Sequence, residues 1–295
     1  MYVRGLVPPM VTPLREDQGL DADAVGRVVD FLIDGGSHAV FISGTMGEFF
    51  GLTDSAREEL VPASVERVAG RVPVLAGVGE SSTERACRRV RHASGAGADA
   101  VVALAPYYYP RYSREEIVEH LLRVRDASAV PVVIYENPHT THLAIEIDDV
   151  MRLAEEDGFV GLKDSSGDWE RFSRLTELIA PREDFFLLQG NTADAGRSVL
   201  AGADGYVPGI GNVAPKVCRA LYDAAASGDE AATAKLQADV DSLREIWEDG
   251  RPVPAAKYAM ELLGICGPVA SSPQLAVTEA EKAQVRSVLG RLGMP

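Results

Sequence analysis

The sequence predicts an α/β protein, a (β/α)8 TIM barrel with a C-terminal helical appendage, and three observations support this fold class. Eight short runs before residue 212 are hydrophobic throughout rather than in alternation, and an amphipathic stretch follows each of them. Such continuous runs are typical of parallel strands that are buried on both faces. Eight strand–helix units in succession favour a closed barrel over an open sheet. The length of 295 residues leaves room for an appendage, because such barrels usually take about 250 residues.

The expected strands share this apolar character and end in small or turn-forming residues. They span residues 5–13, 39–44, 72–79, 100–106, 131–138, 159–166, 185–190 and 204–211. We assign the catalytic barrel to residues 1–225 and a helical region to residues 226–295. Since no linker rich in Gly, Pro or Ser separates the two, we expect the helical region to pack on the barrel.

Start and stop signals place the helices between these strands. Three S/T-x-x-E boxes predict helix starts at Ser81–Glu84, Ser113–Glu116 and Thr278–Glu281. The first predicted helix carries one apolar stripe at helical spacing, made of Val25, Val28, Val29, Leu32 and Ile33. Two glycines at 35–36 end it. Further helices are expected from Pro215 to about Ser227, over 230–248 and over 278–292.

The charge balance argues against a nucleic-acid partner. Lys and Arg total 29 against 44 Asp and Glu, which gives a formal net charge of −15. Nucleic-acid binding needs a concentrated basic face, because the release of counterions from phosphates drives it. The single dense basic stretch, Arg85–Arg91, is interpreted as a solvated helix face.

Membrane insertion and a disulfide framework are not expected either. No apolar run reaches the roughly 18 residues of a membrane span, and the N-terminus lacks the pattern of a signal peptide. The three cysteines are far apart and form no CxxC pair. We therefore expect a reduced, cytoplasmic protein. The histidines His38, His92 and His120 are expected at the surface.

Lys163 is the unusual residue at the carboxyl ends of the strands, where barrels of this kind gather their active sites. It follows an apolar strand, in which an unpaired lysine is costly to bury. A barrel interior disfavours the ammonium form, and the neutral amine is the form that attacks a ketone. The alternative is a strand-end lysine that pairs with Asp164 in solvent. Position alone leaves both open.

Two neighbouring features fit the same chemistry. Tyr135 ends the preceding strand, and a Schiff-base aldolase needs a proton carrier of this kind, although a lone tyrosine is more often a packing residue. The turn at 44–47 (GTMG) offers backbone N–H groups that are able to hold a carboxylate, although its glycines also suit an ordinary tight turn. Glu48 is expected in the first turn of the following helix, with no catalytic role.

With these residues located, the chain resembles the dihydrodipicolinate synthase / N-acetylneuraminate lyase family of pyruvate-dependent class I aldolases. The resemblance rests on four motifs in order: GTMGE at 44–48, PYY at 106–108, YENP at 135–138 and GLKD at 161–164. It extends from the Val11-Thr12-Pro13 strand to the PVPAAK segment at 252–257.

The resemblance implies roles for individual residues. Lys163 would form the imine with pyruvate, and Tyr135 would carry protons above it. Thr45 and Tyr108 would extend the relay toward solvent. The N–H groups of Thr45 and Met46 would hold the pyruvate carboxylate, with Val207 beside it. The resemblance also implies a homotetramer built as a dimer of dimers with Tyr107 near the interface, no metal, and no cofactor beyond the imine on Lys163.

Three departures from the family pattern bear on the second substrate. Met46 replaces a Thr or Ser, and Glu136 replaces the common Asn. Thr140 stands where dihydrodipicolinate synthases carry an arginine that grips the carboxylate of aspartate semialdehyde, and a hydroxyl does not replace a charged bidentate fork. The side chains that suit the hydroxyls of a sugar acid instead are Thr140, Thr141, His139 and Glu136.

The sequence therefore favours a lyase that cleaves or forms a 2-keto-3-deoxy acid from pyruvate and a small aldehyde. Dihydrodipicolinate synthase (4-hydroxy-tetrahydrodipicolinate synthase) and a hydro-lyase of a keto-deoxy acid remain alternatives. A non-catalytic keto-acid sensor would not need the lysine and the relay. A metal-dependent aldolase would use Glu136, His139 and His142, whose spacing matches no known zinc motif. A dinucleotide loop at 77–79 is rejected because its third glycine is missing.

Overall fold

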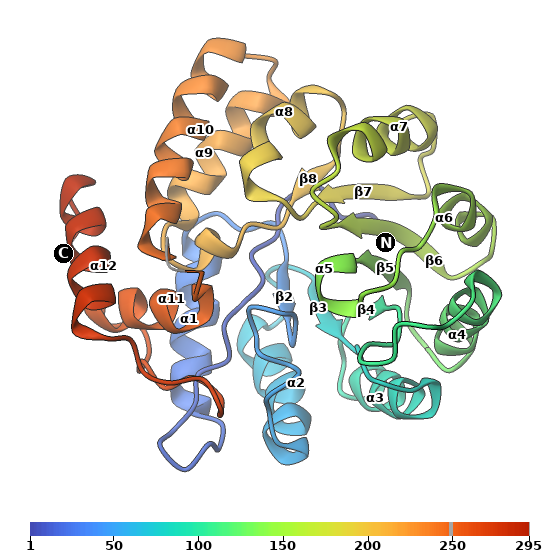
Figure 1. Cartoon of the computed structure of the whole chain (residues 1–295), viewed down its shortest axis with the longest axis horizontal. Coiled ribbons are helices and arrows are strands. Elements are labelled where there is room, and N and C mark those ends of the chain that lie inside the picture. The colour runs from blue at the N-terminus through green and yellow to red at the C-terminus, as the bar shows by residue number, and fades with distance from the viewer. Residues whose placement is uncertain (248–249, 295) are drawn as a thin grey trace.

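The computed structural model describes residues 1–247 and 250–294 and contains eight parallel strands surrounded by helices (Figure 1). The strands are β1 (Gly5–Leu6), β2 (Val40–Ile42), β3 (Val74–Gly77), β4 (Ala100–Leu104), β5 (Val132–Glu136), β6 (Phe159–Asp164), β7 (Phe186–Gln189) and β8 (Gly205–Tyr206). Each strand pairs with the next in the order β1-β8-β7-β6-β5-β4-β3-β2. All eight fall within the predicted runs, so the (β/α)8 fold is confirmed.

Short contacts beyond the strand ends bring β1 and β2 together. The backbone N–H of Met10 donates to the carbonyl of Phe41 at 2.8 Å, and the N–H of Phe41 donates to the carbonyl of Pro8 at 3.1 Å. Closer to β1, the N–H of His38 donates to the carbonyl of Leu6 at 2.8 Å. Together with the β1–β8 ladder, these bonds close the sheet into a barrel.

Helices follow the strands in chain order and most of them cover the outside of the barrel, whereas the short α5 (Pro138–Thr141) lies within the ring that they form (Figure 1). They are α1 (Ala22–Asp34), α2 (Asp54–Val68), α3 (Thr83–Gly95), α4 (Arg114–Asp126), α5 (Pro138–Thr141), α6 (Ile147–Ala154), α7 (Trp169–Ile179), α8 (Ala195–Leu200) and α9 (Pro215–Ala226). The C-terminal helices are α10 (Glu230–Arg244), α11 (Pro252–Leu262) and α12 (Glu279–Arg291), and short 3-10 turns lie at Thr192–Asp194, Gly209–Asn212 and Glu245–Trp247. Residue 248, the end of one predicted helix, lies outside the described residues.

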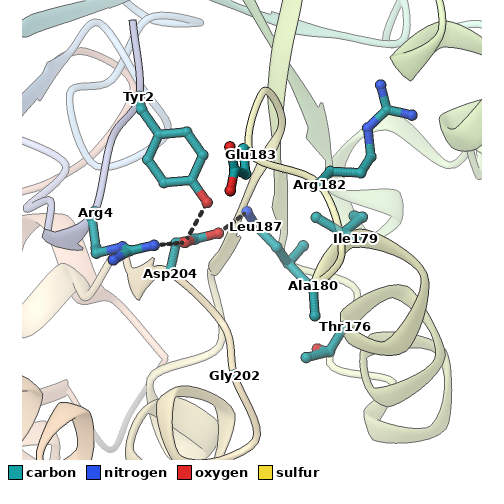
Figure 2. A pocket seen from close by; sticks show the side chains of 10 residues that line it. All are labelled: Tyr2, Arg4, Thr176, Ile179, Ala180, Arg182, Glu183, Leu187, Gly202 and Asp204. Atoms are coloured by element: carbon teal, nitrogen blue, oxygen red, sulfur yellow. Dashed lines mark hydrogen bonds and ion pairs between the residues drawn. The ribbon is translucent and has the colours of Figure 1, made fainter.

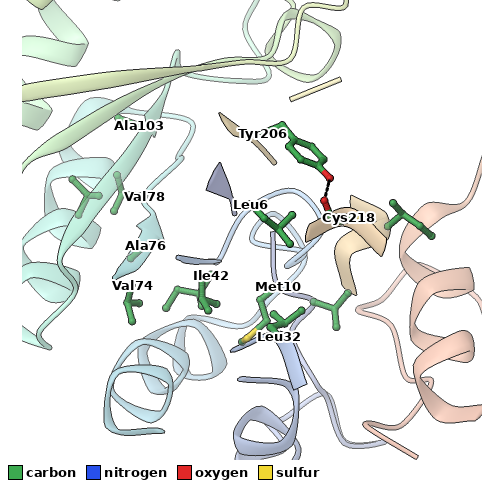
Figure 3. Packing of buried hydrophobic residues seen from close by; sticks show 14 of the residues in the cluster. Leu6, Met10, Leu32, Ile42, Val74, Ala76, Val78, Ala103, Tyr206 and Cys218 are labelled. Carbon is green, nitrogen blue, oxygen red and sulfur yellow. Dashed lines mark hydrogen bonds between the residues drawn. The ribbon is translucent and has the colours of Figure 1, made fainter. Parts of the chain in front are cut away.

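Strand alternation divides the apolar residues into two layers. One cluster fills the barrel interior and includes Phe41, Val133, Tyr135 and Val207. The other lies between strands and helices and contains Leu6, Met10 and Leu32, which Figure 3 shows packed beneath β8 and α9. In this outer layer the Tyr206 hydroxyl donates to the carbonyl of Cys218 at 2.6 Å, which ties β8 to α9 (Figure 3).

The predicted helix signals are confirmed except at α3. Both capping boxes at Ser113 and Thr278 form, α1 buries the stripe around Val28, and Gly36 follows it at a φ of 90°. The expected box at Ser81 is wrong. The cap is Ser82, whose extended backbone makes no side-chain capping bond.

The basic stretch on α3 is not a solvated face throughout, as the sequence had suggested. Arg89 is buried and donates to the Glu80 carboxylate at 3.0 Å, and Arg85 donates to the same carboxylate at 3.0 Å. Arg57 on α2 adds a third guanidinium at 2.9 Å. Glu80 is therefore the counter-ion of three arginines, two of which belong to the basic stretch.

His120 is buried on α4 rather than exposed, so its predicted surface position is wrong. Its Nδ1 accepts from the Thr83 hydroxyl at 3.0 Å, and its Nε2 donates to the carbonyl of Leu104 at 3.1 Å. Burial lowers the pKa of His120 to about 4. The neutral ring thus joins α4 to the end of β4 and the start of α3. His38 and His92 are half-buried.

Cys87, Cys218 and Cys266 are buried, and none of them pairs with another cysteine within the described residues. In the same part of the chain, no helix combines the length and the apolar character needed to cross a membrane.

Candidate active site

Lys163 lies inside the barrel at the carboxyl end of β6. Its strand neighbour Leu162 packs in the outer apolar layer, so alternation turns Lys163 inward. The residue is only 5% exposed, and its Nζ lies 3.8 Å from the centroid of the Tyr135 ring and 4.9 Å from that of Phe41. Among the described residues (1–247 and 250–294), no carboxylate lies within ion-pair distance of this amine.

Asp164, the alternative partner of Lys163 in solvent, faces the other way. It is buried and accepts hydrogen bonds from Arg171 at 2.8 Å and from the Ser166 hydroxyl at 2.6 Å. The solvent-exposed pair that the sequence left open is therefore wrong. The amine therefore lies beside the rings of Tyr135 and Phe41, without a counter-ion among the described residues.

Tyr135 lies directly opposite Lys163 in the β5–β6 register. Its hydroxyl accepts from the amide of Asn137 at 3.0 Å and lies 3.4 Å from the Thr45 hydroxyl. Burial alone raises the pKa of Tyr135, but the charge of Lys163 and hydrogen bonds from Thr45, Lys163 and Ser165 outweigh it, so the net pKa is lowered. A phenol with a lowered pKa next to an amine is suited to proton transfer.

The turn after β2 brings Thr45 to this pair. Small residues are required in it, because a Cβ on Gly44 would lie 2.7 Å from the Phe41 ring and one on Gly47 would lie 2.9 Å from the carbonyl oxygen of Met10. Within the described residues, neither the N–H of Thr45 nor that of Met46 takes part in a hydrogen bond. Two free backbone donors in a tight turn form a place for a carboxylate.

A pocket of about 280 Å³ opens beside Thr45 at the mouth of the barrel. Phe49, Phe50, Leu104, Tyr107, Thr140 and Thr141 complete its lining. Its walls are mostly apolar, and the hydroxyl of Thr141 is already bonded to the carbonyls of Asn137 and Leu143. Thr140, a predicted substrate contact, also lines the pocket, and its hydroxyl donates to the carbonyl of Asn137 at 3.2 Å.

The remaining predicted site residues differ in burial and in the residues that they contact. Val207 is buried in the barrel interior just after β8, and Met46 packs against Gly209. His139 is exposed, with its Nε2 at 2.8 Å from the carbonyl of Ser166. Tyr108 is 87% exposed at a φ of 84°, so its ring does not enter the pocket of its own chain.

Glu136 does not line the site, although the sequence placed it among the substrate contacts. It follows Tyr135 and therefore points to the outer side of the barrel wall, where it is 1% exposed and accepts from the N–H of Ile145 at 3.0 Å. Burial, with a smaller contribution from nearby Asp164, raises its pKa to about 8 against the lowering effects of the Ile145 N–H and of Arg171. Successive residues of a strand face opposite sides of the sheet, so Tyr135 and Glu136 do not both face the barrel interior.

No three His, Cys, Asp or Glu side chains among the described residues are grouped as metal ligands. Glu136 is turned to the outer side of the barrel wall, whereas His139 is exposed and its Nε2 lies at 2.8 Å from the carbonyl of Ser166. The proposed His-x-x-His ligand set is therefore not assembled in this fold.

Two residues that contact Tyr135 and Lys163 were not predicted from the sequence. Asn137 binds the Tyr135 hydroxyl, and Phe41 forms the floor beneath Lys163. A signal for Asn137 was present in its position two residues after Tyr135. Glu48 lies outside any helix, since α2 begins at Asp54, so its predicted helical position is wrong.

A larger pocket of about 550 Å³ lies at the opposite end of the barrel (Figure 2). There the hydroxyl of Tyr2 donates to Asp204 at 2.7 Å, with Arg4 beside it. These residues precede β1 and β8, so the pocket belongs to the amino ends of the strands. In barrels of this kind that end contributes stability rather than chemistry.

Comparisons with known proteins identify the family of this chain. The family model described as the dihydrodipicolinate synthetase family matches residues 2–292. The 4-hydroxy-tetrahydrodipicolinate synthase of Hyphomonas neptunium is 35% identical over 98% of both chains, and that of Phenylobacterium zucineum is 35% identical over 99% of this chain and 98% of its own. An uncharacterized DapA-like lyase of Halobacterium salinarum is 34% identical over 99% of this chain and 95% of its own.

Solved structures are similar over the same length. Dihydrodipicolinate synthase from Aquifex aeolicus superposes with a TM-score of 0.93 at 28% identity, covering 99% of each chain. YagE from Escherichia coli K12, solved in complex with pyruvate, gives a TM-score of 0.93 at 27% identity, again covering 99% of each. The fold and site define a barrel lyase of the class I aldolase type. The chain belongs to the dihydrodipicolinate synthetase family.

The buried position of Glu136 generates a prediction about stability. Because its folded pKa of about 8 exceeds the ordinary value, the folded state holds a proton that the unfolded state releases. The stabilising contribution of this proton to the free energy of unfolding is complete below about pH 4.5, and it is lost as the pH rises through about 8. Glu136→Gln should therefore raise the free energy of unfolding at pH 9 by a few kcal/mol at most, and change it little at pH 5. Denaturant titrations at both pH values measure this. Glu119→Gln, at an exposed position on α4, is the control, and an equal effect of Glu136→Gln at both pH values would contradict the prediction.

Proposed function

We propose that this chain is a pyruvate-dependent class I aldolase in which Lys163 forms an imine with pyruvate and no cofactor is needed. The observation that carries the proposal is the buried Lys163 amine, which lies against the Tyr135 ring without a carboxylate partner among the described residues. An imine supplies the electron sink for carbon–carbon chemistry, because its nitrogen accepts the electron pair of the bond that breaks.

In the proposed reaction, the neutral amine attacks the ketone carbon of pyruvate, and the ketone oxygen leaves as water after protonation. Loss of a methyl proton gives an enamine, whose carbon attacks the aldehyde carbon while the aldehyde oxygen takes up a proton. Hydrolysis of the imine then frees the product and the amine. We assign the movement of these protons to Tyr135 and Thr45, since their hydroxyls lie 3.4 Å apart and the Tyr135 ring lies beside the amine.

The pyruvate carboxylate is assigned to the turn after β2. The N–H groups of Thr45 and Met46 are free to donate to it, and Val207 supplies an apolar wall within the barrel. Charge-assisted hydrogen bonds from backbone N–H groups are strong and keep a fixed direction.

For the second substrate, the comparisons favour 4-hydroxy-tetrahydrodipicolinate synthesis over the sugar-acid cleavage that the sequence had suggested. Several relatives at 32–35% identity carry the name of that synthase. The outward position of Glu136 also removes one of the groups expected to bind sugar hydroxyls. We therefore place condensation with aspartate semialdehyde first.

A lyase for a 2-keto-3-deoxy acid remains the second candidate because of Thr140. The pocket beside Thr45 has no charged residue in its lining as far as the structure describes it, and Thr140 supplies only a hydroxyl. A carboxylate-bearing aldehyde would have to find its cation elsewhere, whereas a neutral aldehyde would not.

We further propose a homotetramer in which the loop of Tyr107 and Tyr108 faces another copy of the chain. Tyr108 is 87% exposed in a left-handed conformation, and Phe50 and Tyr109 near it are 54% and 51% exposed. Exposed aromatic side chains of this size are typical of interfaces. In such an assembly Tyr108 would extend the relay of a neighbouring pocket rather than its own.

The imine is tested directly by incubating the protein with pyruvate and borohydride and then mapping the mass increase. The expected product is a reduced adduct on Lys163, and Lys163→Ala should abolish it together with turnover. Lys257, the other buried lysine, should stay unmodified and serves as the internal control. An unmodified Lys163 in active enzyme would refute the proposal. Turnover that a chelator stops would then point to a metal route.

The relay is tested by Tyr135→Phe, which removes the hydroxyl and keeps the ring beside the amine. Pyruvate binding should be retained, while kcat should fall by about 10²–10⁴-fold, the usual contribution of a general acid–base group. Steady-state kinetics and imine trapping on the same preparation measure the two effects. Wild-type turnover in Tyr135→Phe would exclude Tyr135 from the relay.

The second substrate is tested by Thr140→Arg. If position 140 faces the aldehyde, a bidentate guanidinium should lower the KM for aspartate semialdehyde about tenfold or more and leave the KM for pyruvate unchanged. Thr140→Lys adds charge without the fork and should have a smaller effect. An unchanged KM in both variants would show that residue 140 does not contact this substrate. A parallel screen of keto-deoxy acids for pyruvate release tests the second candidate.

A further inference from the structure

A buried ion pair joins the loop after β2 to the C-terminal helices. Glu48 and Lys257 are 209 positions apart in the chain, and both side chains are 0% exposed. The Lys257 amine contacts the Glu48 carboxylate, and neither residue belongs to the catalytic group around Lys163. Charges are rarely buried so completely, because removing them from water is costly and packing apolar residues in their place is often no less stable.

The polar atoms of this pair are bound from several sides. Oε1 of Glu48 accepts from the N–H of Ser271 at 2.6 Å and from the side-chain amide of Gln274 at 3.0 Å. The Lys257 amine also donates to the carbonyl of Val269 at 2.7 Å. Burial lowers the pKa of Lys257, and the Glu48 charge opposes that effect. The carboxylate therefore holds α11 and the segment between α11 and α12 at once.

The backbone of Glu48 is held in a conformation that a non-glycine residue avoids. Its φ is 59°, in the left-handed region, where the Cβ crowds the backbone. Its N–H donates to the carbonyl of Thr45 at 3.0 Å, and its own carbonyl accepts from Gly51 at 2.8 Å and from Leu52 at 3.2 Å. An unfavourable backbone conformation persists only where its surroundings enforce it, and here the buried carboxylate is the anchor.

The anchor lies three residues from the reacting groups. Glu48 binds the carbonyl of Thr45, and the hydroxyl of Thr45 contacts Tyr135, which lies against Lys163. A second support comes from Thr12, whose hydroxyl donates to the carbonyl of Gly47 at 2.7 Å. Any displacement of Glu48 is thus transmitted to the N–H groups of Thr45 and Met46.

We propose that Glu48 and Lys257 are positioning residues, which hold the turn at 44–48 in the orientation that receives the pyruvate carboxylate. The C-terminal helical region thereby becomes part of the active site rather than an appendage that only covers the barrel. This inference rests on the proposed function, since it assigns the carboxylate to that turn.

The test compares the pyruvate dependence of imine formation in wild type, Glu48→Gln, Lys257→Met and the double variant. Each folded single variant should need about 10–100-fold more pyruvate for half-maximal trapping of Lys163. At saturating pyruvate, kcat should stay within about threefold of wild type, because the reacting groups remain. The double variant should be no worse than the poorer single variant, since both act through one contact.

Glu281→Gln is the matched control, because it breaks the Arg251–Glu281 pair, 2.8 Å long, within the same C-terminal region. It should lower the melting temperature and leave the half-saturating pyruvate concentration unchanged. This separates the loss of stability from the loss of positioning.

Gln274→Met is a milder variant, which removes one donor to Glu48 and keeps the ion pair. A rise of about threefold in half-saturating pyruvate is expected for it. Folded Glu48→Gln and Lys257→Met proteins with wild-type half-saturation would overturn the inference. If neither folds, wild-type half-saturation in Gln274→Met would overturn it. Failure of wild-type protein to trap pyruvate would instead refute the proposed function.

Discussion

The buried amine of Lys163 is the constraint to which the rest of the site is adapted. An amine inside the barrel has to be tolerated without a carboxylate, and the rings of Tyr135 and Phe41 provide that surface at 3.8 and 4.9 Å. The adjacent acid, Asp164, is turned outward and forms an ion pair with Arg171, so it does not form one with the amine. Strand alternation achieves both results, because successive residues of β6 face opposite sides of the barrel wall.

The same alternation separates two kinds of ionisable group in this protein. Groups that face inward, such as Lys163 and Tyr135, meet each other across adjacent strands. Groups that face outward, such as Glu136 and Asp164, lie between barrel and helices, where burial raises the pKa of Glu136 to about 8. The inward-facing and outward-facing groups are thus separated by the strand itself, and the Glu48–Lys257 pair joins the C-terminal helices to the turn that carries Thr45.

The fold and the neighbouring positions of Lys163 and Tyr135 were predictable from the sequence, whereas the contacts that surround them were not. Continuous apolar runs and capping boxes depend on neighbours within a few residues, and the boxes at Ser113 and Thr278 formed as predicted. The box at Ser81 did not form, and Arg89 nearby is buried with Glu80 rather than solvated. His120 was assigned to the surface because its partners, Thr83 and Leu104, lie 37 and 16 positions away.

Local sequence was sufficient to establish eight parallel strands, their helices and a lysine and tyrosine at neighbouring strand ends, because these features follow from hydrophobic periodicity and from the order of the strands. Tertiary structure alone decided which polar side chains meet. Glu48 and Lys257 are 209 positions apart in the chain. Glu136 does not line the site because its side chain points to the outer side of its strand. Polar contacts between distant residues depend on how distant segments pack, and a pattern within a short stretch of sequence does not predict that packing.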